Sequence, residues 1–318
     1  TVYSRKGINC PTASISASPI TIKDKKDLMF GLKNDVDYVA LSFVKSARDI
    51  NSLRKIIKGR GKDTKIIAKI ERHEAITNLR EIIKAADGVM VARGDLGIEI
   101  PAEKVPIMQK LIIKIARKYG KPVITATQVL QSMVENARAT RAEISDAANA
   151  VFDNTDAIML SNESAVGKYP FKAARTLSKV SMEVEKEIRH HPELYEGDSP
   201  EVVSTLCGTC LNASEMARDM KADAIIVYSD DGYTARHIAR NRLFTEIITI
   251  TPDEKTAREL TLVWGINDLF VKKIAKGNNK VDQILKYMKK VKAIRKNQKV
   301  VIVCHASKKD SLISTIKV

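Results

Sequence analysis

The sequence has few of the features that mark membrane, secreted or disulfide-rich proteins. No apolar run in its 318 residues approaches the ~20 residues that a helix needs to cross a bilayer, so we expect no membrane partner. No secretory signal opens the chain, and it has only four cysteines, which favours a reducing, cytoplasmic setting. The chain starts at Thr1 without the character of a domain start, so we expect it to begin inside a longer protein.

Two of the cysteines, Cys207 and Cys210, form a C-x-x-C pair. Such a pair is either a redox centre or half of a zinc site in many proteins. Here it falls in a segment with a helical pattern, without a second pair or flanking metal ligands. We therefore expect two buried thiols with no metal role.

Aromatic residues are also scarce, at 5%, whereas positive charge is abundant, with a formal net charge of +16. A basic protein can bind nucleic acid. However, the lysines are spread along the chain, and the densest basic stretch, Lys286 to Lys299, has the pattern of a solvated helix face. We expect no nucleic-acid partner and a surface that suits anionic substrates.

The sequence does contain a regular alternation of buried strands and amphipathic helices. Short apolar runs predict strands at 37–44, 66–71, 88–92, 122–126 and 156–160. Helical patterns occur at 23–34, with Thr21 as the cap, and at 46–58, 104–119, 141–152 and 170–189. In the helix at 104–119, Ile107, Leu111 and Ile115 form one apolar face. This alternation is typical of α/β domains with a parallel sheet.

Each of these strands ends in a polar cluster. They are Ser42, Lys69 with Glu71, Gly94 with Asp95, Thr125 with Thr127, and Ser161 with Glu163. Polar carboxyl ends on all strands are typical of a (β/α)8 TIM barrel with its active site on one rim. A closed barrel needs about eight strands, and five are recognisable, so we expect the others upstream of Thr1.

A second, smaller α/β domain with a mostly parallel sheet is predicted after a linker. The predicted boundaries are a partial barrel at 1–190, a linker at 191–200 and the second domain at 201–318. Expected strands lie at 224–228, 247–251, 269–271 and 300–304, with helices at 201–220, 233–240, 252–263 and 280–291.

The stretch from Lys65 to Gly97 carries the most specific chemistry. Lys69 and Glu71 lie two apart on a strand, so their side chains share a face. If the next strand is a parallel neighbour, Asp95, in the loop after it, reaches the same rim. Two carboxylates and an ammonium would hold a divalent cation and an anionic substrate. The alternative is a surface ion pair and an ordinary Arg-Gly-Asp turn.

Several segments together resemble the pyruvate kinase family, and the resemblance covers essentially the whole chain. They are Lys69 to Glu71, Met90 to Gly97, Glu99 to Pro101, Lys121 to Gln128, Thr140 to Glu143, Met159 to Ser161, Gly167 to Pro170, Ala235-Arg236 and Leu262 to Gly265.

This resemblance implies a (β/α)8 barrel with a lid domain inserted after its third strand, followed by a C-terminal α/β domain. The present chain would hold the last five barrel strands and the C-terminal domain, and 6–11 resembles the return from the lid. It also implies a homotetrameric phosphotransferase that moves the phosphoryl group of phosphoenolpyruvate to ADP, giving pyruvate and ATP. The cofactors would be Mg²⁺ or Mn²⁺, and K⁺, whose ligands would lie outside this chain.

The resemblance assigns roles to the rim residues. Glu71 and Asp95 resemble the metal ligands, and Lys69 resembles the lysine that stabilises the phosphoryl group in transfer. Gly94 and Asp95 would offer backbone N–H groups to the substrate carboxylate, at a helix start that favours anions. Thr127 matches the threonine beside the substrate.

Ser161 and Glu163 match groups that order water near the carbon that is protonated. Without the family, a helix cap is the alternative for Ser161 and for Thr127. Asn154 and Asn162 stand where the family usually has glycine, and asparagine is well suited to a left-handed turn.

The resemblance also limits what this chain can do alone. We expect residues 1–318 to be inactive, because parts of the nucleotide and phosphate sites would be missing. The loop from Ser229 to Thr234 corresponds to a sugar-phosphate effector loop, and its Asp230 and Asp231 would repel phosphate, so we expect no activation by fructose bisphosphate there.

Two other functions remain open from the sequence. One is a metal-dependent lyase acting on pyruvate-like enolates, which would share Glu71 and Asp95 but would not need ADP. The other is a binding protein with a decayed site, against which the intact Lys69, Glu71, Asp95 and Thr127 argue.

Overall fold

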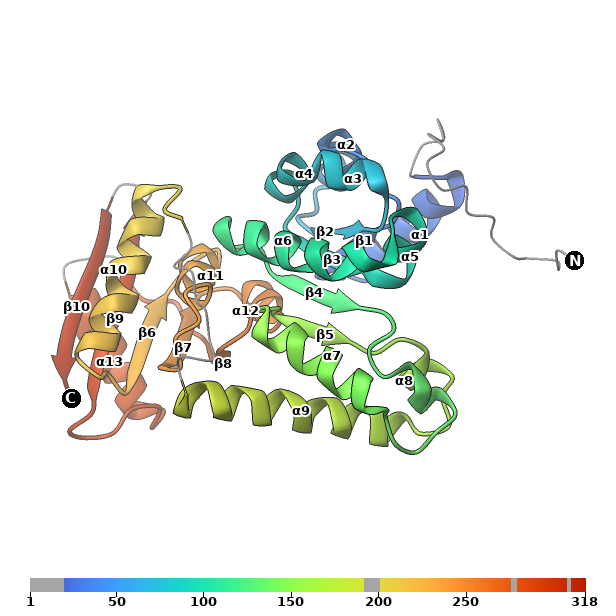
Figure 1. Ribbon diagram of the computed structural model, residues 1–318. Coiled ribbons are helices and arrows are strands. Elements are labelled where there is room, and N and C mark those ends of the chain that lie inside the picture. Colours follow the sequence, from blue (N-terminus) through green and yellow to red (C-terminus); the bar gives the residue numbers. More distant parts are fainter. Residues whose placement is uncertain (1–19, 192–200, 276–278, 308–309) are drawn as a thin grey trace, which may run out of the picture. The chain divides into compact units, whose positions relative to one another are not determined.

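The computed structural model describes residues 20–191, 201–275, 279–307 and 310–318 (Figure 1). The chain forms two compact units, 1–116 with 123–187, and 117–122 with 188–318. The segment at 6–11, Cys10 and nearly all of the predicted linker at 191–200 lie outside the described residues, so the linker stays a prediction.

The first unit contains a parallel five-stranded sheet in the order β1-β2-β3-β4-β5. Its strands are β1 (Tyr38–Leu41), β2 (Lys65–Ile70), β3 (Gly88–Ala92), β4 (Val123–Ala126) and β5 (Ala157–Met159). The predicted fold class is confirmed, since all five strands are parallel neighbours in chain order. Their carboxyl ends therefore meet at one edge of the sheet.

Helices join these strands, and two of them begin at the capping boxes of Thr21 with Asp24 and Thr140 with Glu143. The helices are α1 (Ile22–Lys33), α2 (Ala47–Lys58), α3 (His73–Thr77), α4 (Leu79–Ala85), α5 (Arg93–Glu99), α6 (Val105–Lys118), α7 (Arg141–Phe152), α8 (Asn162–Ala165) and α9 (Pro170–His190), with 3-10 turns η1 (Ala102–Lys104) and η2 (Gln131–Val134).

Two local predictions in this unit are wrong. The charged segment after β3 is not a loop, because α5 starts at Arg93, directly where the strand ends. Of the predicted apolar face of α6, Ile115 is buried together with Ile112, Ile113 and Ala116, whereas Ile107 and Leu111 are 61% and 39% exposed. A periodic apolar pattern fixes which residues share a face, but α6 carries apolar residues on more than one face.

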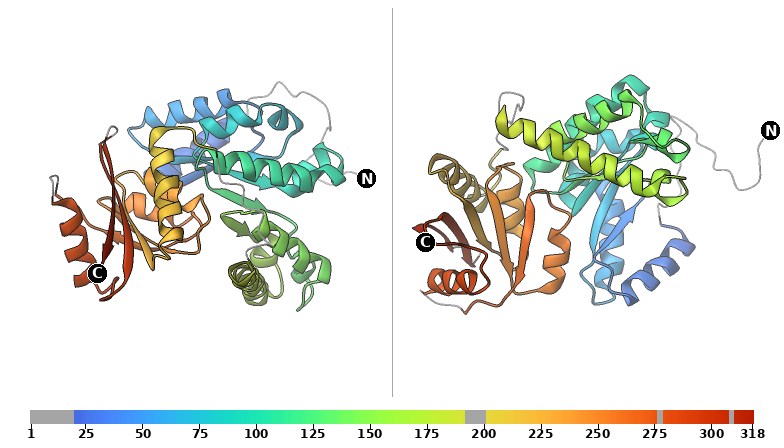
Figure 2. Two further views of the ribbon diagram at one scale, coloured as in Figure 1. Left: turned by 60° about the vertical axis from the view of Figure 1, so that its left-hand side comes forward. Right: turned by 90° about the horizontal axis from the view of Figure 1, so that it is seen from below.

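The second unit is built around a sheet in the order β10-β9-β6-β7-β8 (Figure 2). Its elements are α10 (Thr205–Asp219), β6 (Ala224–Tyr228), α11 (Tyr233–Ala239), β7 (Glu246–Thr251), α12 (Glu254–Leu260), β8 (Ile266–Val271), α13 (Lys280–Lys290), β9 (Lys299–Ser307) and β10 (Asp310–Lys317). Four strands are parallel, as predicted, and β10 is an antiparallel strand that the sequence analysis missed.

Both faces of this second sheet are covered. Along β6, Ile225 and Val227 belong to one buried cluster, and Ala224, Ile226 and Tyr228 belong to another. Successive side chains on a strand point to opposite faces, so the two clusters are the two cores of a doubly covered sheet.

Cys207 and Cys210 form no disulfide and are buried in α10, so the predicted burial in a helix is confirmed. Burial raises the pKa of Cys210 to about 12. Among the described residues, no helix combines the length and apolar character that a membrane crossing requires.

Candidate active site

Lys69 and Glu71 meet at the carboxyl end of β2. The Nζ of Lys69 lies 3.1 Å from Oε2 of Glu71 and donates a hydrogen bond of 2.8 Å to Oγ of Ser42. The backbone N–H of Phe43 donates to Oε1 of Glu71 at 2.6 Å. Ser42 and Phe43 follow β1, so this cluster joins the ends of two neighbouring strands. Sequence analysis placed Ser42 at the rim but did not foresee its bond to Lys69.

Glu71 is buried, with only 1% of its surface exposed. Its Oε2 receives no hydrogen bond from the described residues, and the ammonium of Lys69 stands beside it. A buried carboxylate oxygen without a donor has unused capacity to bind a cation. Carboxylate oxygen is also the ligand type that Mg²⁺ and Mn²⁺ prefer, so the residues present fit a divalent ion.

Asp95 lies in the first turn of α5 and is exposed. Because β2 and β3 are parallel neighbours, with Ile70 paired to Val91, α5 begins at the same edge of the sheet as Glu71. The sequence prediction that Asp95 shares the rim with Lys69 and Glu71 is therefore consistent with the topology.

Thr127 follows β4 at the same edge and holds the start of α5. Its Oγ1 accepts the backbone N–H of Gly94 at 2.7 Å and donates to the carbonyl of Ala126 at 2.6 Å. The side chain therefore satisfies an amide in the first turn of α5 and does not cap η2, the next helical turn along the chain, whose N-cap is Leu130. The amide of Gly94, predicted to meet a substrate carboxylate, is engaged by Thr127 in this structure.

The backbone of Thr127 is strained. Its φ is +68°, and φ of the next residue, Gln128, is +54°. A β-branched residue with positive φ is rare and is found mostly where the surrounding structure enforces it. Strain of this kind clusters at binding sites and catalytic sites, which supports the assignment of this rim as the site.

Arg93 helps to hold Thr127 and Gln128 in this strained conformation. The sequence analysis assigned no role to Arg93. Its side chain is buried, 8% exposed, and it donates to the carbonyl oxygens of Thr127 and Gln128. Its Nη1 also lies 2.7 Å from a carboxylate oxygen of Asp146. The segment that resembles the family included Arg93, but nothing in the spacing predicted that it is buried.

Ser161 and Glu163 lie at the carboxyl end of β5, as predicted. Glu163 is fully buried, and its two oxygens accept the backbone N–H groups of Leu130 and Ser161 at 3.0 and 2.8 Å. Glu163 thus joins the segments that follow β4 and β5. Ser161 occupies the N-cap position of α8, but its side chain makes no capping hydrogen bond.

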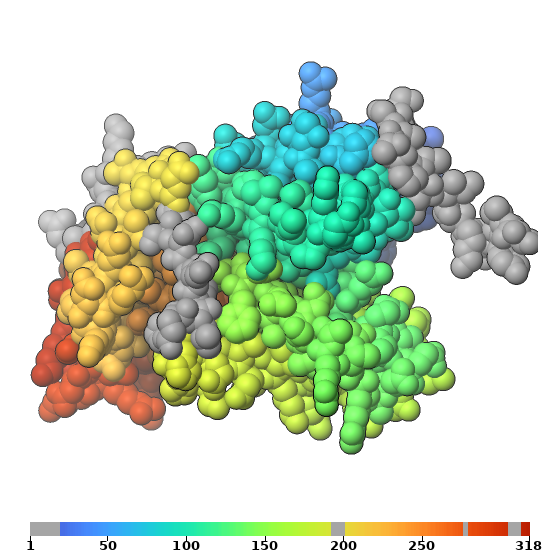
Figure 3. Space-filling model, viewed as in Figure 1, coloured from blue at the N-terminus to red at the C-terminus, as the bar shows by residue number. Residues whose placement is uncertain are grey.

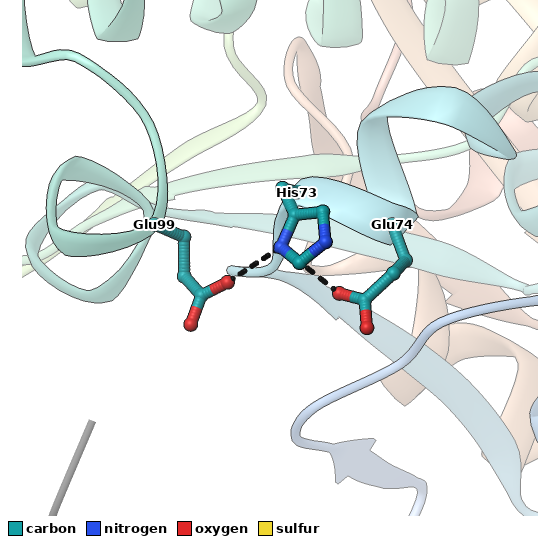
Figure 4. Close-up of side chains that lie close together, drawn as sticks. All are labelled: His73, Glu74 and Glu99. Atoms are coloured by element: carbon teal, nitrogen blue, oxygen red, sulfur yellow. Dashed lines mark hydrogen bonds and ion pairs between the residues drawn. The ribbon is translucent and has the colours of Figure 1, made fainter. Parts of the chain in front are cut away.

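A second charged cluster lies just beyond Glu71, where His73 stands between two carboxylates (Figure 4). His73 Nδ1 is 2.9 Å from Oε2 of Glu99 and 3.3 Å from Oε2 of Glu74. Arg72 pairs with Glu74 through Nε and Nη2 at 2.9 and 3.1 Å. Arg72, His73 and Glu74 closely follow β2, and Glu99 ends α5, but the contacts among them were not predictable from the sequence.

A cavity of about 860 Å³ borders this edge of the first unit. Arg93, Gly94 and Gln128 line one part of it, and residues of α6 and α7 line the rest. These two segments are the teal and green surfaces that adjoin in Figure 3. The cavity is therefore bordered by α5, α6 and α7, and it reaches the strained turn after β4 at Gln128.

The two asparagines that replace the family's glycines differ in conformation. Asn154 has a φ of +71°, so the left-handed turn expected there is present. Asn162 is the first residue of α8 and does not have a positive φ. Only the first position needs the tolerance of asparagine for left-handed backbone.

Comparison with known proteins identifies both units. The family of pyruvate kinase barrel domains matches residues 1–174, and the family of pyruvate kinase alpha/beta domains matches residues 208–318. A crystal structure of a pyruvate kinase from Cryptosporidium parvum superposes with a TM-score of 0.85 at 34% identity, covering 97% of this chain and 64% of that one.

Curated relatives agree with this. Pyruvate kinase 2 of Synechocystis is 46% identical over 85% of this chain, and the pyruvate kinase of Clostridium acetobutylicum is 46% identical over 84%. The aligned parts are 45% and 57% of those proteins, so the chain spans about half the length of the curated relatives it matches. On the strength of two family matches and these identities, the chain belongs to the pyruvate kinase family.

Proposed function

We propose that this chain carries the metal-binding and phosphoryl-transfer residues of a pyruvate kinase, which transfers the phosphoryl group of phosphoenolpyruvate to ADP. The observation that carries the proposal is the cluster of Lys69 with the buried Glu71 at the end of β2, beside the start of α5 with Asp95. Two carboxylates and one ammonium at a single rim suit a triphosphate-forming reaction, in which catalysis is mainly positioning and charge stabilisation.

Glu71 and Asp95 would hold Mg²⁺ or Mn²⁺. When bound, the divalent ion supplies positive charge that polarises phosphoryl oxygens. The ammonium of Lys69 contacts Ser42 and Glu71, so it lies beside one of the proposed metal ligands. There it would stabilise the charge on the phosphoryl group as this group moves from one oxygen to the other. Because both partners hold Lys69 in place, little reorganisation is needed during transfer.

Thr127 and Gly94 would orient the substrate carboxylate. In this structure the Gly94 amide donates to the Thr127 hydroxyl and that hydroxyl donates to the carbonyl of Ala126, so a bound carboxylate would take the place of these acceptors. Ser161 and Glu163 would order the water that protonates the product carbon. The burial of Glu163 favours an indirect part for it, through the position of Ser161 and Leu130.

Further parts of the proposal rest on the family. The gene's complete product would also need K⁺, whose ligands we place outside this chain, and would form a homotetramer in the cytoplasm. The exposed Ile98, Ile107 and Leu111 on α5 and α6 support an interface between subunits. We propose that residues 1–318 alone are inactive, since they align with only 45% and 57% of the two curated relatives.

The test is an assay of pyruvate formation from phosphoenolpyruvate and ADP with Mg²⁺ and K⁺, on this chain and on the gene's complete product. Activity that depends on ADP and occurs only in the complete product supports the proposal. Turnover without ADP would favour the lyase, although the relatives reported above are all pyruvate kinases. If Mn²⁺ binds neither to the unsubstituted protein nor to Asp95→Asn, the result would favour a binding protein with a decayed site.

A further inference from the structure

A contact between His73 and Glu99 lies just outside the rim. His73 is the first residue of α3, and Glu99 is the last residue of α5. Nδ1 of the imidazole lies 2.9 Å from Oε2 of Glu99, and the Glu99 side chain is only 8% exposed (Figure 4). Nδ1 faces one carboxylate oxygen of Glu99 and one of Glu74. Because an ionised carboxylate only accepts hydrogen bonds, Nδ1 carries the hydrogen and donates it.

This cluster has the residue types of a metal site, but its charges argue against one. The guanidinium of Arg72 occupies both oxygens of Glu74 and lies 3.9 Å from Glu99. A divalent cation would have to displace this buried guanidinium or accept its repulsion at close range. The cluster is therefore satisfied internally, as a set of hydrogen bonds between α3 and α5.

The bridge joins the two segments that carry the proposed metal ligands. His73 stands two residues after Glu71, and Glu99 stands four residues after Asp95 on a helix of only seven residues. At its other end, α5 is held by the bond from the Gly94 amide to Thr127. A helix this short has few internal hydrogen bonds, so its orientation depends on ties at both ends.

We propose that His73 is a positioning residue that acts through Glu99 to hold α5, and with it Asp95, at the correct place relative to Glu71. This inference rests on the proposed function, because it takes Glu71 and Asp95 as the metal ligands. Partners that orient a metal ligand typically change metal affinity by about 10–100-fold when they are removed. The same size of effect is expected when the His73–Glu99 bond is removed.

The test is the affinity for Mn²⁺, measured by electron paramagnetic resonance on this chain at one fixed pH. The variants are His73→Leu, which removes the donor, His73→Asn, which places an amide N–H near the position of Nδ1, and Glu99→Gln. Glu71→Gln tests the metal site itself. Glu103→Gln, on the exposed η1, is the matched control for the loss of one carboxylate.

We expect His73→Leu to weaken Mn²⁺ binding by about 10-fold or more, with most of the affinity restored in His73→Asn. Equal affinity in His73→Leu and the unsubstituted chain, with binding lost in Glu71→Gln, would overturn the inference but keep the metal site. Full binding in Glu71→Gln would overturn the proposed site and the inference together. Equal weakening in His73→Leu and His73→Asn would also refute the role of the hydrogen bond.

Folding is checked by circular dichroism on each variant. If His73→Leu does not fold, Glu99→Gln decides, because it keeps the shape of the side chain and removes its charge. A fall in affinity beyond that of Glu103→Gln then supports the inference, and affinity equal to that control overturns it.

Discussion

The side chain of Arg93 donates hydrogen bonds from Nε and Nη2 to the carbonyl oxygen of Thr127, at 3.2 and 2.9 Å. Thr127 is the residue whose φ is +68° and whose hydroxyl accepts the amide of Gly94. Arg93 and Gly94 are neighbours at the start of α5. Their hydrogen bonds to Thr127 therefore fix the start of this helix against the turn after β4. The strained turn is thus maintained by two adjacent residues of one helix.

The first prediction concerns Arg93→Lys. Lysine keeps the charge but loses the planar fork that serves Thr127, Gln128 and Asp146 together. We expect the free energy of unfolding to fall by about 1–3 kcal/mol, because buried acceptors lose their donors. Urea denaturation followed by circular dichroism measures this, and pyruvate formation by the complete gene product should fall as well.

The matched control is Arg54→Lys. Arg54 also binds a backbone carbonyl, that of Ala85 at 2.7 Å, and an aspartate, Asp87 at 2.9 Å, but these lie where β3 begins, at the opposite end of the sheet. It should lose stability without losing activity. If the two variants lose activity equally, Arg93 has no special connection with the site.

The second prediction concerns Asn154, whose φ is +71° and whose side-chain amide donates to the carbonyl of Phe152 at 3.2 Å. Alanine in a left-handed conformation costs about 1–2 kcal/mol, whereas glycine has no Cβ to clash. We expect Asn154→Ala to lower the free energy of unfolding by about that amount and Asn154→Gly to leave it nearly unchanged. Equal stability of the two variants would contradict the conformational explanation.

The third prediction concerns His237, whose pKa is lowered to about 3 because it is buried in the second unit. In the unfolded chain its pKa is about 6.5. Between these values the unfolded chain binds more protons, so the contribution is fully present above pH 6.5 and is lost as the pH falls toward 3. The expected slope is up to about 1.4 kcal/mol per pH unit.

His237→Phe tests this, since phenylalanine keeps a ring to stack on Tyr233, now 3.9 Å away, and cannot titrate. Urea denaturation is followed by the fluorescence of Trp264, the single tryptophan, which belongs to the same unit. The substitution should flatten the loss of stability in acid, and the same change at the exposed His190 should not. An unchanged slope in His237→Phe would show that the histidine does not titrate as described.

The fourth prediction concerns the loop from Ser229 to Thr234. Asp231 accepts the backbone N–H of Tyr233 at 2.9 Å, and both Asp230 and Asp231 are exposed where a phosphate would have to approach. We predict no activation by fructose bisphosphate through this loop, because two carboxylates repel a phosphate. Isothermal titration calorimetry measures the binding. Tight, activating binding in the complete gene product that is lost when Asp230 and Asp231 are changed to asparagine would refute this.

Strands were predictable where both faces are buried, because such strands read as continuous apolar runs. Both β3 (Gly88–Ala92) and β6 (Ala224–Tyr228) were predicted at their observed boundaries. The edge strand β10 pairs only with β9, and its sequence, DSLISTIK, has neither a continuous apolar run nor a regular alternation, so no strand pattern identified it. The local pattern did not predict α5, because Arg-Gly-Asp is typical of a turn, whereas the family resemblance placed Gly94 and Asp95 at a helix start; contacts with Thr127 support the helix.

The site was predictable in its titratable residues but not in its supports. The spacing of Lys69 and Glu71 placed them on one face, and the structure brings them to 3.1 Å. The roles of Arg93 and His73 depend on contacts between distant parts of the chain, which no local pattern encodes. Glu163 illustrates the same limit, since its position was foreseen but not its bonds to two backbone amides.

The most direct test of the central claim is the rate of pyruvate formation by the complete gene product carrying Lys69→Met. Lys65→Met is the control, because Lys65 lies on the same strand at its other end, paired with Asp63. Removal of one charge-stabilising donor lowers kcat by about 10²–10³. The proposed role of Lys69 predicts a loss of this size in Lys69→Met and little change in Lys65→Met. A Lys69→Met enzyme as active as that control would contradict the assignment of this rim as the site of phosphoryl transfer.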